Sequence, residues 1–296
     1  MNSQLVTIDE MNLSTLEPIT KKNALNSLES GQVIYFPNYF FQLNANEQAL
    51  LSEVILDHKH KNISYDLSNH RIKGISPTIA ALGINADTVE QFMHRYAQFA
   101  KELVIELLPH YREALQIGRT SFRTAEIEGR KTSKRKNDTR VHVDSFAATP
   151  VHGLRILRVF CNVNPENKPR VWHLGEPFSE LLKKFATKIP RYNSWYAKGL
   201  KWLNVTKTLR TAYDHYMLQL HDQMKLDDEY QTTLHKFRME FPSKSSWIVF
   251  TDQTSHAALS GQFLLEQTFY LPVSAMKNPE LSPLKQWERE VDEVLI

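Results

Sequence analysis

The chain has 296 residues, of which 42% are apolar and 23% are charged, and its formal net charge at pH 7 is +3. These values are typical of a globular protein that buries a sizeable core in one large domain or two small ones, and with only 9 glycines they exclude a glycine-rich repeat. The single cysteine, Cys161, excludes a disulfide framework and is typical of a reducing compartment.

The sequence lacks the segments that carry a chain into or across a membrane. Residues 1–22 contain no basic segment followed by an apolar stretch, which a secretory signal would require. No run approaches the ~20 consecutive apolar residues of a membrane-spanning helix. We therefore expect a cytoplasmic protein, or one bound to the cytoplasmic face of a membrane.

Positive charge is concentrated in two segments. Residues 130–140 carry six basic side chains and one acid, Asp138, and residues 181–210 carry eight basic side chains and no acid. Local charge of this kind favours an anionic partner, such as a phosphate, a carboxylate, a membrane surface or a nucleic acid.

In chain order, the first 117 residues are predicted to be mainly helical. Residues 32–36 (QVIYF) have the composition of a strand. Residues 44–58 have apolar side chains at helical spacing behind a capping Asn44, and residues 87–113 show a longer pattern of the same kind.

The second half of the chain is predicted to form a β core that a helical insert interrupts. Strand patterns cover residues 121–127, 140–146, 154–163, 170–174, 247–251 and 263–271. We therefore assign residues 118–176 and 241–275 to the core and residues 177–240 to the insert, within a single domain of residues 1–296. The expected class is α+β, with an antiparallel double-sheet barrel covered by helices.

The clearest candidate for chemistry is the pair His142 and Asp144. Residues two apart in an extended strand point to the same side, so an imidazole and a carboxylate converge there. His256, which follows the strand 247–251, is the natural third ligand, and two histidines with one carboxylate suit Fe(II) oxygen chemistry. His-x-Asp alone is a weak pattern, and the alternative is a surface strand with a His–Asp hydrogen bond.

Three segments carry a family resemblance: RVHVDSF (140–146), LRILRVFCNVNP (154–165) and WIVFTDQTSHAALSGQFLLEQTFYLP (247–272). Together they resemble the double-stranded β-helix, a jelly-roll or cupin-like fold, of 2-oxoglutarate-dependent dioxygenases. More narrowly, residues 30–285 resemble the Kdo hydroxylases. The resemblance implies that His142, Asp144 and His256 bind Fe(II), and that 2-oxoglutarate and O2 are co-substrates. It also implies hydroxylation at C3 of 3-deoxy-D-manno-octulosonic acid (Kdo) in lipid A or lipopolysaccharide precursors.

The sequence departs from the family pattern at the position of the cation that binds 2-oxoglutarate. Its distal carboxylate needs a cation, ideally the fork of an arginine, and related enzymes carry this arginine on the strand after the distal histidine. Residues 261–271 contain no arginine or lysine. Gln262 and Gln267 stand there instead, and we expect Gln267 to contact the co-substrate. Trp172 is expected to wall the pocket, with a purely structural core tryptophan as the alternative.

Two arginines on predicted core strands are the candidates for the missing cation. A charged side chain in an otherwise apolar strand is costly unless it is paired. We expect Arg158 to point into the barrel, with Arg123 as its partner in binding the co-substrate. The alternative for each is a structural salt bridge, for example with Glu126 or Glu266.

The basic insert segment 181–210 also contains aromatic side chains: Phe185, Tyr192, Trp195, Tyr196 and Trp202. Lysine, arginine, tryptophan and tyrosine together suit a membrane interface with anionic headgroups. We expect a peripheral contact with the inner-membrane surface, where a Kdo-lipid A type glycolipid would be the substrate. The alternative is a solvated basic helix whose aromatic side chains pack inward. Nucleic acid is not expected as a partner, because no nucleic-acid motif accompanies the segment.

Two other functions stay open at this point. One is a 2-oxoglutarate oxygenase that acts on a protein side chain or a small acid. The other is a non-catalytic β-barrel that binds an anionic lipid or sugar, which the missing arginine after His256 keeps in consideration.

Overall fold

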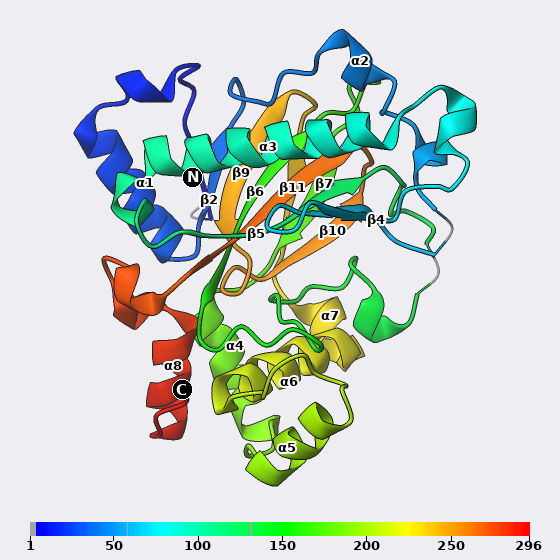
Figure 1. Cartoon of the computed structure of the whole chain (residues 1–296). Helices are drawn as coiled ribbons and strands as arrows, with labels where there is room; N and C mark the ends of the chain where they lie inside the picture. The colour runs from blue at the N-terminus through cyan, green and yellow to red at the C-terminus, as the bar shows by residue number, and fades with distance from the viewer. Residues whose placement is uncertain (1–3, 58, 131) are drawn as a thin grey trace.

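The computed structural model describes residues 4–57, 59–130 and 132–296, apart from the side chains of Leu82 and Tyr196. Eight strands form a large sheet: β1 (Leu5–Thr7), β2 (Val33–Phe36), β3 (Ile63–Asp66), β4 (Arg71–Lys73), β5 (Gln116–Arg123), β6 (Arg155–Asn162), β9 (Ser245–Phe250) and β11 (Leu264–Leu271). Their order is β1-β2-β9-β6-β11-β5-β3-β4, and neighbours are antiparallel except for the parallel pair β1–β2. The expected mixture of helices with a large antiparallel sheet is confirmed (Figure 1).

A second sheet packs against one face of the large one. It consists of β7 (Arg170–Leu174), β8 (Phe237–Phe241) and β10 (His256–Ser260), in the order β10-β7-β8. Aromatic rings join the two sheets: the ring of Trp247 lies 5.6 Å from Trp172 and 4.0 Å from Phe241, centroid to centroid. Because β6 and β9 are covered on both faces, every residue in them is buried, which explains their almost continuous apolar sequences.

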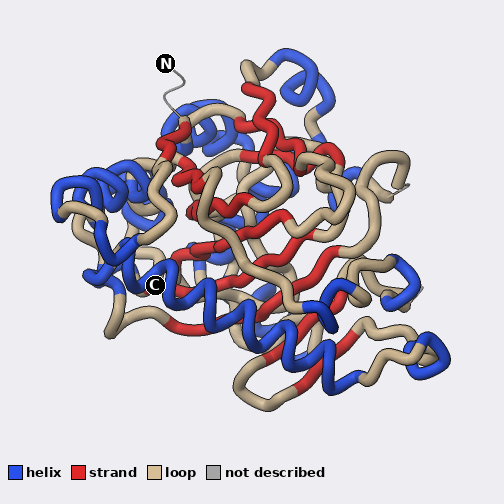
Figure 2. Tube along the Cα trace, turned by 90° about the horizontal axis from the view of Figure 1, so that it is seen from above, coloured by secondary structure: helices blue, strands red, loops and turns tan. Residues whose placement is uncertain are grey.

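Helix α3 (Ala86–Leu107) runs along the opposite face of the large sheet (Figures 1 and 2). The Asn85 side chain caps it by accepting a hydrogen bond from the backbone N–H of Asp87. The helix was predicted over residues 87–113 but ends at Leu107. The reason is Pro109, because a proline disfavours the helical conformation in the residue before it. Leu108 accordingly has φ −125°.

Tyr96 ties α3 to the sheet beneath it. Its buried hydroxyl lies 2.9 Å from the carbonyl oxygen of Val159 in β6 and 3.2 Å from that of Leu265 in β11. We expect Tyr96→Phe to lower the free energy of unfolding by about 1 kcal/mol, the net worth of one buried hydrogen bond. Urea unfolding measures this loss. Tyr39→Phe is the control, because the Tyr39 ring stacks on Phe99 and, within the described part of the chain, its hydroxyl forms no hydrogen bond with a strand of the sheet. Equal stability of both variants and the native chain would contradict the expectation.

The remaining helices are α1 (Pro18–Glu29), α2 (Ala45–Gln48), α4 (Phe178–Phe185), α5 (Ser194–Trp202), α6 (Ala212–Leu226), α7 (Asp228–Thr233) and α8 (Pro283–Val291). Helices α4 to α7 come from the predicted insert and lie together at one end of the molecule, at the bottom of Figure 1. Among the described residues, no helix has both the length and the apolar character to span a membrane.

Three predicted elements differ from the structure. The described part of residues 44–58, residues 44–57, contains the short α2 and a 3-10 turn, Glu53–Ile55, rather than one helix. The first 117 residues, predicted mainly helical with one strand at 32–36, supply β1, β3 and β4 as well as the predicted β2; these three strands are too short to show a clear alternation of side chains. The insert prediction extended to residue 240, but its last residues already form β8.

Candidate metal centre and its cavity

Backbone hydrogen bonds fix the positions of the three predicted ligands. The segment 140–146 is extended but forms only one isolated bridge, between His142 and His256, rather than the predicted strand. In this bridge the His142 N–H donates to the His256 carbonyl at 2.9 Å, and the His256 N–H donates back at 2.8 Å. The Asp144 N–H donates to the carbonyl of Thr251 at 2.7 Å. His256, predicted in a loop, is the first residue of β10.

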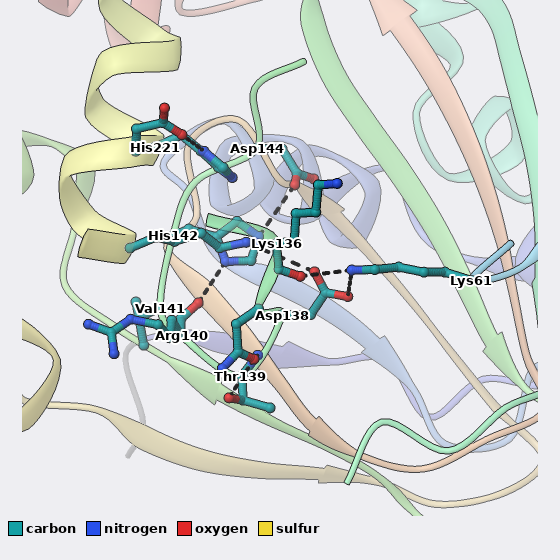
Figure 3. A network of polar contacts seen from close by, with 12 residues as sticks. Lys61, Lys136, Asp138, Thr139, Arg140, Val141, His142, Asp144 and His221 are labelled. Carbon is teal, nitrogen blue, oxygen red and sulfur yellow. Dashed lines mark hydrogen bonds and ion pairs between the residues drawn. The ribbon is translucent and has the colours of Figure 1, made fainter. Parts of the chain in front are cut away.

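The three side chains converge on one point. One ligand atom from each of His142, Asp144 and His256 lies within 4.8 Å of the other two. Nδ1 of His142 donates to the carbonyl oxygen of Arg140 at 2.8 Å, and Nδ1 of His256 donates to that of Thr254 at 2.9 Å. These bonds fix the ring orientations and leave the lone pair of each imidazole on Nε2. Figure 3 shows His142 directed toward Asp144, where Nε2 lies 3.7 Å from Oδ1.

The electrostatic environment keeps all three groups in the form that binds a metal. Burial lowers the pKa of His142 to about 3 and also lowers the pKa of His256, so both imidazoles are neutral. Burial opposes ionisation of Asp144, but the Arg158 guanidinium and the neighbouring His142 and His256 together outweigh it and hold the pKa of this carboxyl well below its usual range. Metal ligands must be deprotonated, and here the fold supplies that state.

The arrangement fits a divalent metal ion of the Fe(II) type. The Oδ2 atom of Asp144 is buried without a hydrogen bond, although the Arg158 guanidinium lies 3.2 Å away. A buried carboxylate oxygen in that state is costly unless it has a further partner. Two imidazoles and one carboxylate on one side of an ion leave its other positions open for small oxygen ligands.

The triad lies in a cavity between the two sheets. Its other lining residues are Arg123, Asp138, Arg158, Phe160, Arg170, Trp172, Ala258 and Glu266. Trp172 therefore reaches the cavity as predicted, and its ring stacks on His256 with centroids 4.9 Å apart. It is also part of the aromatic layer between the sheets, so it serves both of the roles considered from the sequence.

Arg158 and Arg123 both reach the cavity, and both are paired with Glu266. An Arg158 nitrogen lies 3.2 Å from Glu266 Oε1, and Arg123 donates two hydrogen bonds to Glu266 Oε2 at 3.0 and 2.8 Å. The three side chains follow from strand pairing, because Arg158 on β6 and Arg123 on β5 flank Glu266 on the central β11. The two guanidinium groups thus compensate a buried carboxylate as well as facing the cavity.

Gln267 does not reach the cavity. Successive residues of a strand face opposite sides, so Gln267 points away from the side that Glu266 occupies. Its Oε1 accepts a hydrogen bond from the Thr120 hydroxyl at 2.6 Å, and its Nε2 donates to the Thr268 carbonyl at 2.7 Å. The side chain is fully buried on the face of the sheet that α3 covers.

Arg170, which the sequence did not point to, has the least compensated charge in the cavity. It begins β7 and is 3% exposed. It donates to the Gly261 carbonyl at 2.7 Å, while its Nε has no hydrogen-bond partner. Among the described residues, no carboxylate forms an ion pair with it, in contrast to Arg123 and Arg158. Burial, followed by repulsion from Arg123, lowers the pKa of Arg170 to about 9.

Helix α6 passes close to the triad. The ring of His221 lies 5.3 Å from that of His142, centroid to centroid. One helical turn later, Lys225 is 2% exposed, and burial lowers its pKa. Its Nζ lies 3.9 Å from Asp138, which also pairs with Lys61 at 3.3 Å (Figure 3). The sequence placed this helix in the insert but gave no sign that it approaches the metal ligands.

Residues 134–140 of the basic segment are held by acids of the insert. Lys134 and Arg140 pair with Asp228 at 2.5 and 2.7 Å, and Arg135 pairs with Asp222 at 3.2 Å. Several of its charges are therefore already partnered within the chain.

Comparisons with known proteins agree with this geometry. The family model described as 3-deoxy-D-manno-oct-2-ulosonic acid (Kdo) hydroxylase matches residues 13–293. Among solved structures, the chain is similar to the Kdo hydroxylase KdoO, a non-haem Fe(II) alpha-ketoglutarate-dependent dioxygenase, in complex with cobalt(II). The two are 41% identical, with 99% of this chain and 97% of that chain covered and a TM-score of 0.93. KdoO in complex with alpha-ketoglutarate and Fe(III) matches at the same identity and coverage, with a TM-score of 0.92. A search among curated proteins found no match.

Proposed function

The chain belongs to the Kdo hydroxylase family, and from this premise we propose that it hydroxylates a Kdo sugar in a lipid A or lipopolysaccharide precursor, at C3. The reaction depends on Fe(II) and 2-oxoglutarate, because the similar KdoO is a non-haem Fe(II) alpha-ketoglutarate-dependent dioxygenase. The observation that carries the proposal is the convergence of His142, Asp144 and His256, whose ligand atoms lie within 4.8 Å of one another.

In this proposal the three triad side chains hold the iron, and the cavity around them orients the co-substrate. Bound iron, with 2-oxoglutarate and O2, supplies the oxidising power for hydroxylating an unactivated C–H bond. The chain supplies geometry: the carbonyls of Arg140 and Thr254 orient the imidazoles, and Trp172 covers one face of His256. The two facing sheets and the bridge between His142 and His256 support a double-stranded β-helix within a single domain of residues 1–296.

We propose Arg170 as the anchor of the distal carboxylate of 2-oxoglutarate. A buried arginine without a carboxylate partner is costly, and an anionic ligand would remove that cost. Arg123 and Arg158 remain the other candidates, but their guanidinium groups already pair with Glu266. Arg158 in addition lies 3.2 Å from Asp144, which favours a role beside the metal ligand.

The charge around the cavity supports an anionic substrate as well as an anionic co-substrate. Five cations, Arg123, Arg158, Arg170, Lys61 and Lys225, surround three carboxylates, Asp138, Asp144 and Glu266. Lys225 lies on α6 near the triad, where it could contact a substrate that approaches the iron. We assign Lys225 to the carboxylate of the Kdo sugar.

Lys225→Met is expected to raise the KM for the sugar substrate by about tenfold to a hundredfold, which is the worth of one hydrogen bond to a charged group. The KM for 2-oxoglutarate should not change, because Arg170 holds that molecule. Steady-state kinetics with each substrate varied in turn measures both values. Lys236→Met is the matched control, since Lys236 is exposed beyond the insert helices. A rise in the KM for 2-oxoglutarate alone would contradict the assignment.

We further propose that the enzyme acts in the cytoplasm at the face of the inner membrane. A lipid A precursor is an amphiphile, so its acyl chains remain in the bilayer while its sugar reaches the protein. This part of the proposal is supported by the basic and aromatic composition of residues 181–210.

The test is succinate release from 2-oxoglutarate by protein loaded anaerobically with Fe(II) and then exposed to air. A release that increases with a Kdo-lipid A precursor, together with a mass gain of one oxygen on that precursor, is the expected result. Succinate release that does not change when the precursor is added would still indicate an oxygenase, but would favour a protein side chain or small acid as its substrate. No release under any condition would favour the non-catalytic binding module.

A further inference from the structure

A surface with several exposed apolar side chains is formed by α5 and the residues that follow it. Five large apolar side chains are exposed there: Trp195 (79%), Trp202 (82%), Leu203 (62%), Val205 (53%) and Leu209 (45%). We call these residues, with Lys198, Lys201 and Lys207 among them, the α5 surface. Apolar groups that gather on one exposed surface usually mark a binding site. The alternative considered from the sequence, that the aromatic side chains pack inward, is wrong for both tryptophans, and the Tyr196 side chain lies outside the described residues.

The lysines of the α5 surface have no acidic partners. Lys198, Lys201 and Lys207 are exposed, and within the described part of the chain none of them forms an ion pair with a carboxylate. The neighbouring basic side chains of the insert differ in this respect, since Lys184 pairs with Glu176 and Lys188 with Asp227. The α5 surface therefore presents uncompensated positive charge beside exposed tryptophan.

The other side of this segment is fixed to the catalytic part of the chain. Ala197 and Thr206 are buried, so the segment has an inner side as well as an exposed one. The Lys207 N–H donates to the Ala148 carbonyl at 3.0 Å, and Arg210 donates to that of Ala147 at 2.9 Å. Residues 147 and 148 follow closely on the metal ligand Asp144, so the α5 surface is connected directly to the loop that leaves the metal centre.

The composition of the surface distinguishes between kinds of partner. Lysine is depleted in protein–protein interfaces, which argues against a protein. Nucleic-acid bases stack on aromatic rings, but Leu203, Val205 and Leu209 have no ring to offer. Tryptophan at the level of the headgroups, aliphatic side chains below it and lysines facing anionic headgroups are the features of a helix that lies in a membrane interface.

We propose that the α5 surface binds the protein to a bilayer of anionic lipids and thereby places the metal centre at the membrane surface. This inference rests on the proposed function for its purpose, because a glycolipid substrate is held in such a bilayer. The binding itself needs neither iron nor turnover and can be measured separately.

The experiment is co-sedimentation of the full chain with vesicles of phosphatidylglycerol and phosphatidylcholine, or of phosphatidylcholine alone. We expect binding to the anionic vesicles that weakens as salt is added. Replacing Lys198, Lys201 and Lys207 with glutamine should weaken it about a hundredfold, and Trp195→Ser with Trp202→Ser at least about tenfold. The matched controls are Lys22, Lys59 and Lys73 to glutamine, and Met11→Ser with Val54→Ser, which are exposed elsewhere and should have no effect.

Activity separates this inference from the proposed function. The tryptophan variant should keep its turnover on a deacylated, water-soluble Kdo oligosaccharide and lose it on the glycolipid in vesicles. If the native chain binds vesicles but shows no turnover, membrane binding by the α5 surface would be supported and the proposed reaction would be overturned. Equal binding to both vesicle types, or unchanged binding by the tryptophan variant, would overturn the membrane surface. A dimer without vesicles that Trp202→Ser disrupts would show that a second copy covers the surface, and would also overturn it.

Discussion

Replacing His142 with alanine should abolish turnover while leaving the fold intact. The imidazole is one of only three protein ligands in the candidate metal centre, and its loss leaves Asp144 and His256 without the geometry that defines the open positions. Changes to the groups that merely orient metal ligands cost about 10–100-fold. Loss of a ligand itself should exceed that range, so we expect metal affinity and succinate release each to fall by about a thousandfold or more.

Anaerobic titration with Co(II), followed by its visible absorption, measures the loss of metal binding independently of activity. His173→Ala is the matched control: His173 lies on β7 next to Trp172, and because strand side chains alternate it faces away from the cavity. It should bind Co(II) as the native chain does. Full Co(II) binding by the His142→Ala variant would show that the metal is held elsewhere.

The convergence of His142 and Asp144 could be predicted because it depends on local geometry alone. Residues two apart in any extended segment point to the same side, so His142 and Asp144 converge although residues 140–146 form a single bridge rather than a strand. The third ligand followed from its place after a strongly apolar strand, β9. What the sequence could not give is the reciprocal hydrogen bonding of His142 and His256, which depends on tertiary pairing.

The arginines of the cavity, among them the proposed anchor Arg170, were harder to predict because their positions depend on which strands become neighbours. Arg170 lies 28 positions after His142 and reaches the cavity only because β7 pairs with β10. One local indication was present. Trp172 was expected at the pocket, and Arg170, two residues earlier on the same strand, must face the same side. The same rule applied to β11 excludes Gln267 once Glu266 is seen to face the cavity.

The helical insert shows what helical periodicity alone cannot predict. Helical periodicity predicted its helices, but it could not decide whether the tryptophans of residues 181–210 pack inward or face solvent. That choice depends on which face of the helix packs against other elements, and in α5 the side chains of Trp195 and Trp202 are 79% and 82% exposed. For the same reason, the sequence could not show that Lys225 lies near His142, because this depends on where α6 packs in the fold.

Arg170→Met should raise the KM for 2-oxoglutarate by about 10²–10⁴-fold, because the distal carboxylate loses two charge-assisted hydrogen bonds of ~1.5–3 kcal/mol each. A conservative Arg170→Lys variant should recover part of this loss, since a lysine keeps the charge but cannot form the bidentate fork. The KM for the sugar should stay near its native value. Kinetics with 2-oxoglutarate varied measures the effect.

Thermal unfolding separates this role from a structural one. Among the described residues no carboxylate forms an ion pair with the buried Arg170, so its replacement by methionine removes a poorly compensated charge and should leave the melting temperature unchanged or raise it. Native protein with metal should be stabilised further by 2-oxoglutarate, whereas the Arg170→Met variant should not. A variant that unfolds at lower temperature but is still stabilised by 2-oxoglutarate would make Arg170 a structural residue.

Arg158→Met is the decisive comparison. Because Arg158 compensates both Asp144 and Glu266, its loss should destabilise the fold even without ligand. If Arg158→Met instead abolished only the response to 2-oxoglutarate, Arg158 would be the anchor.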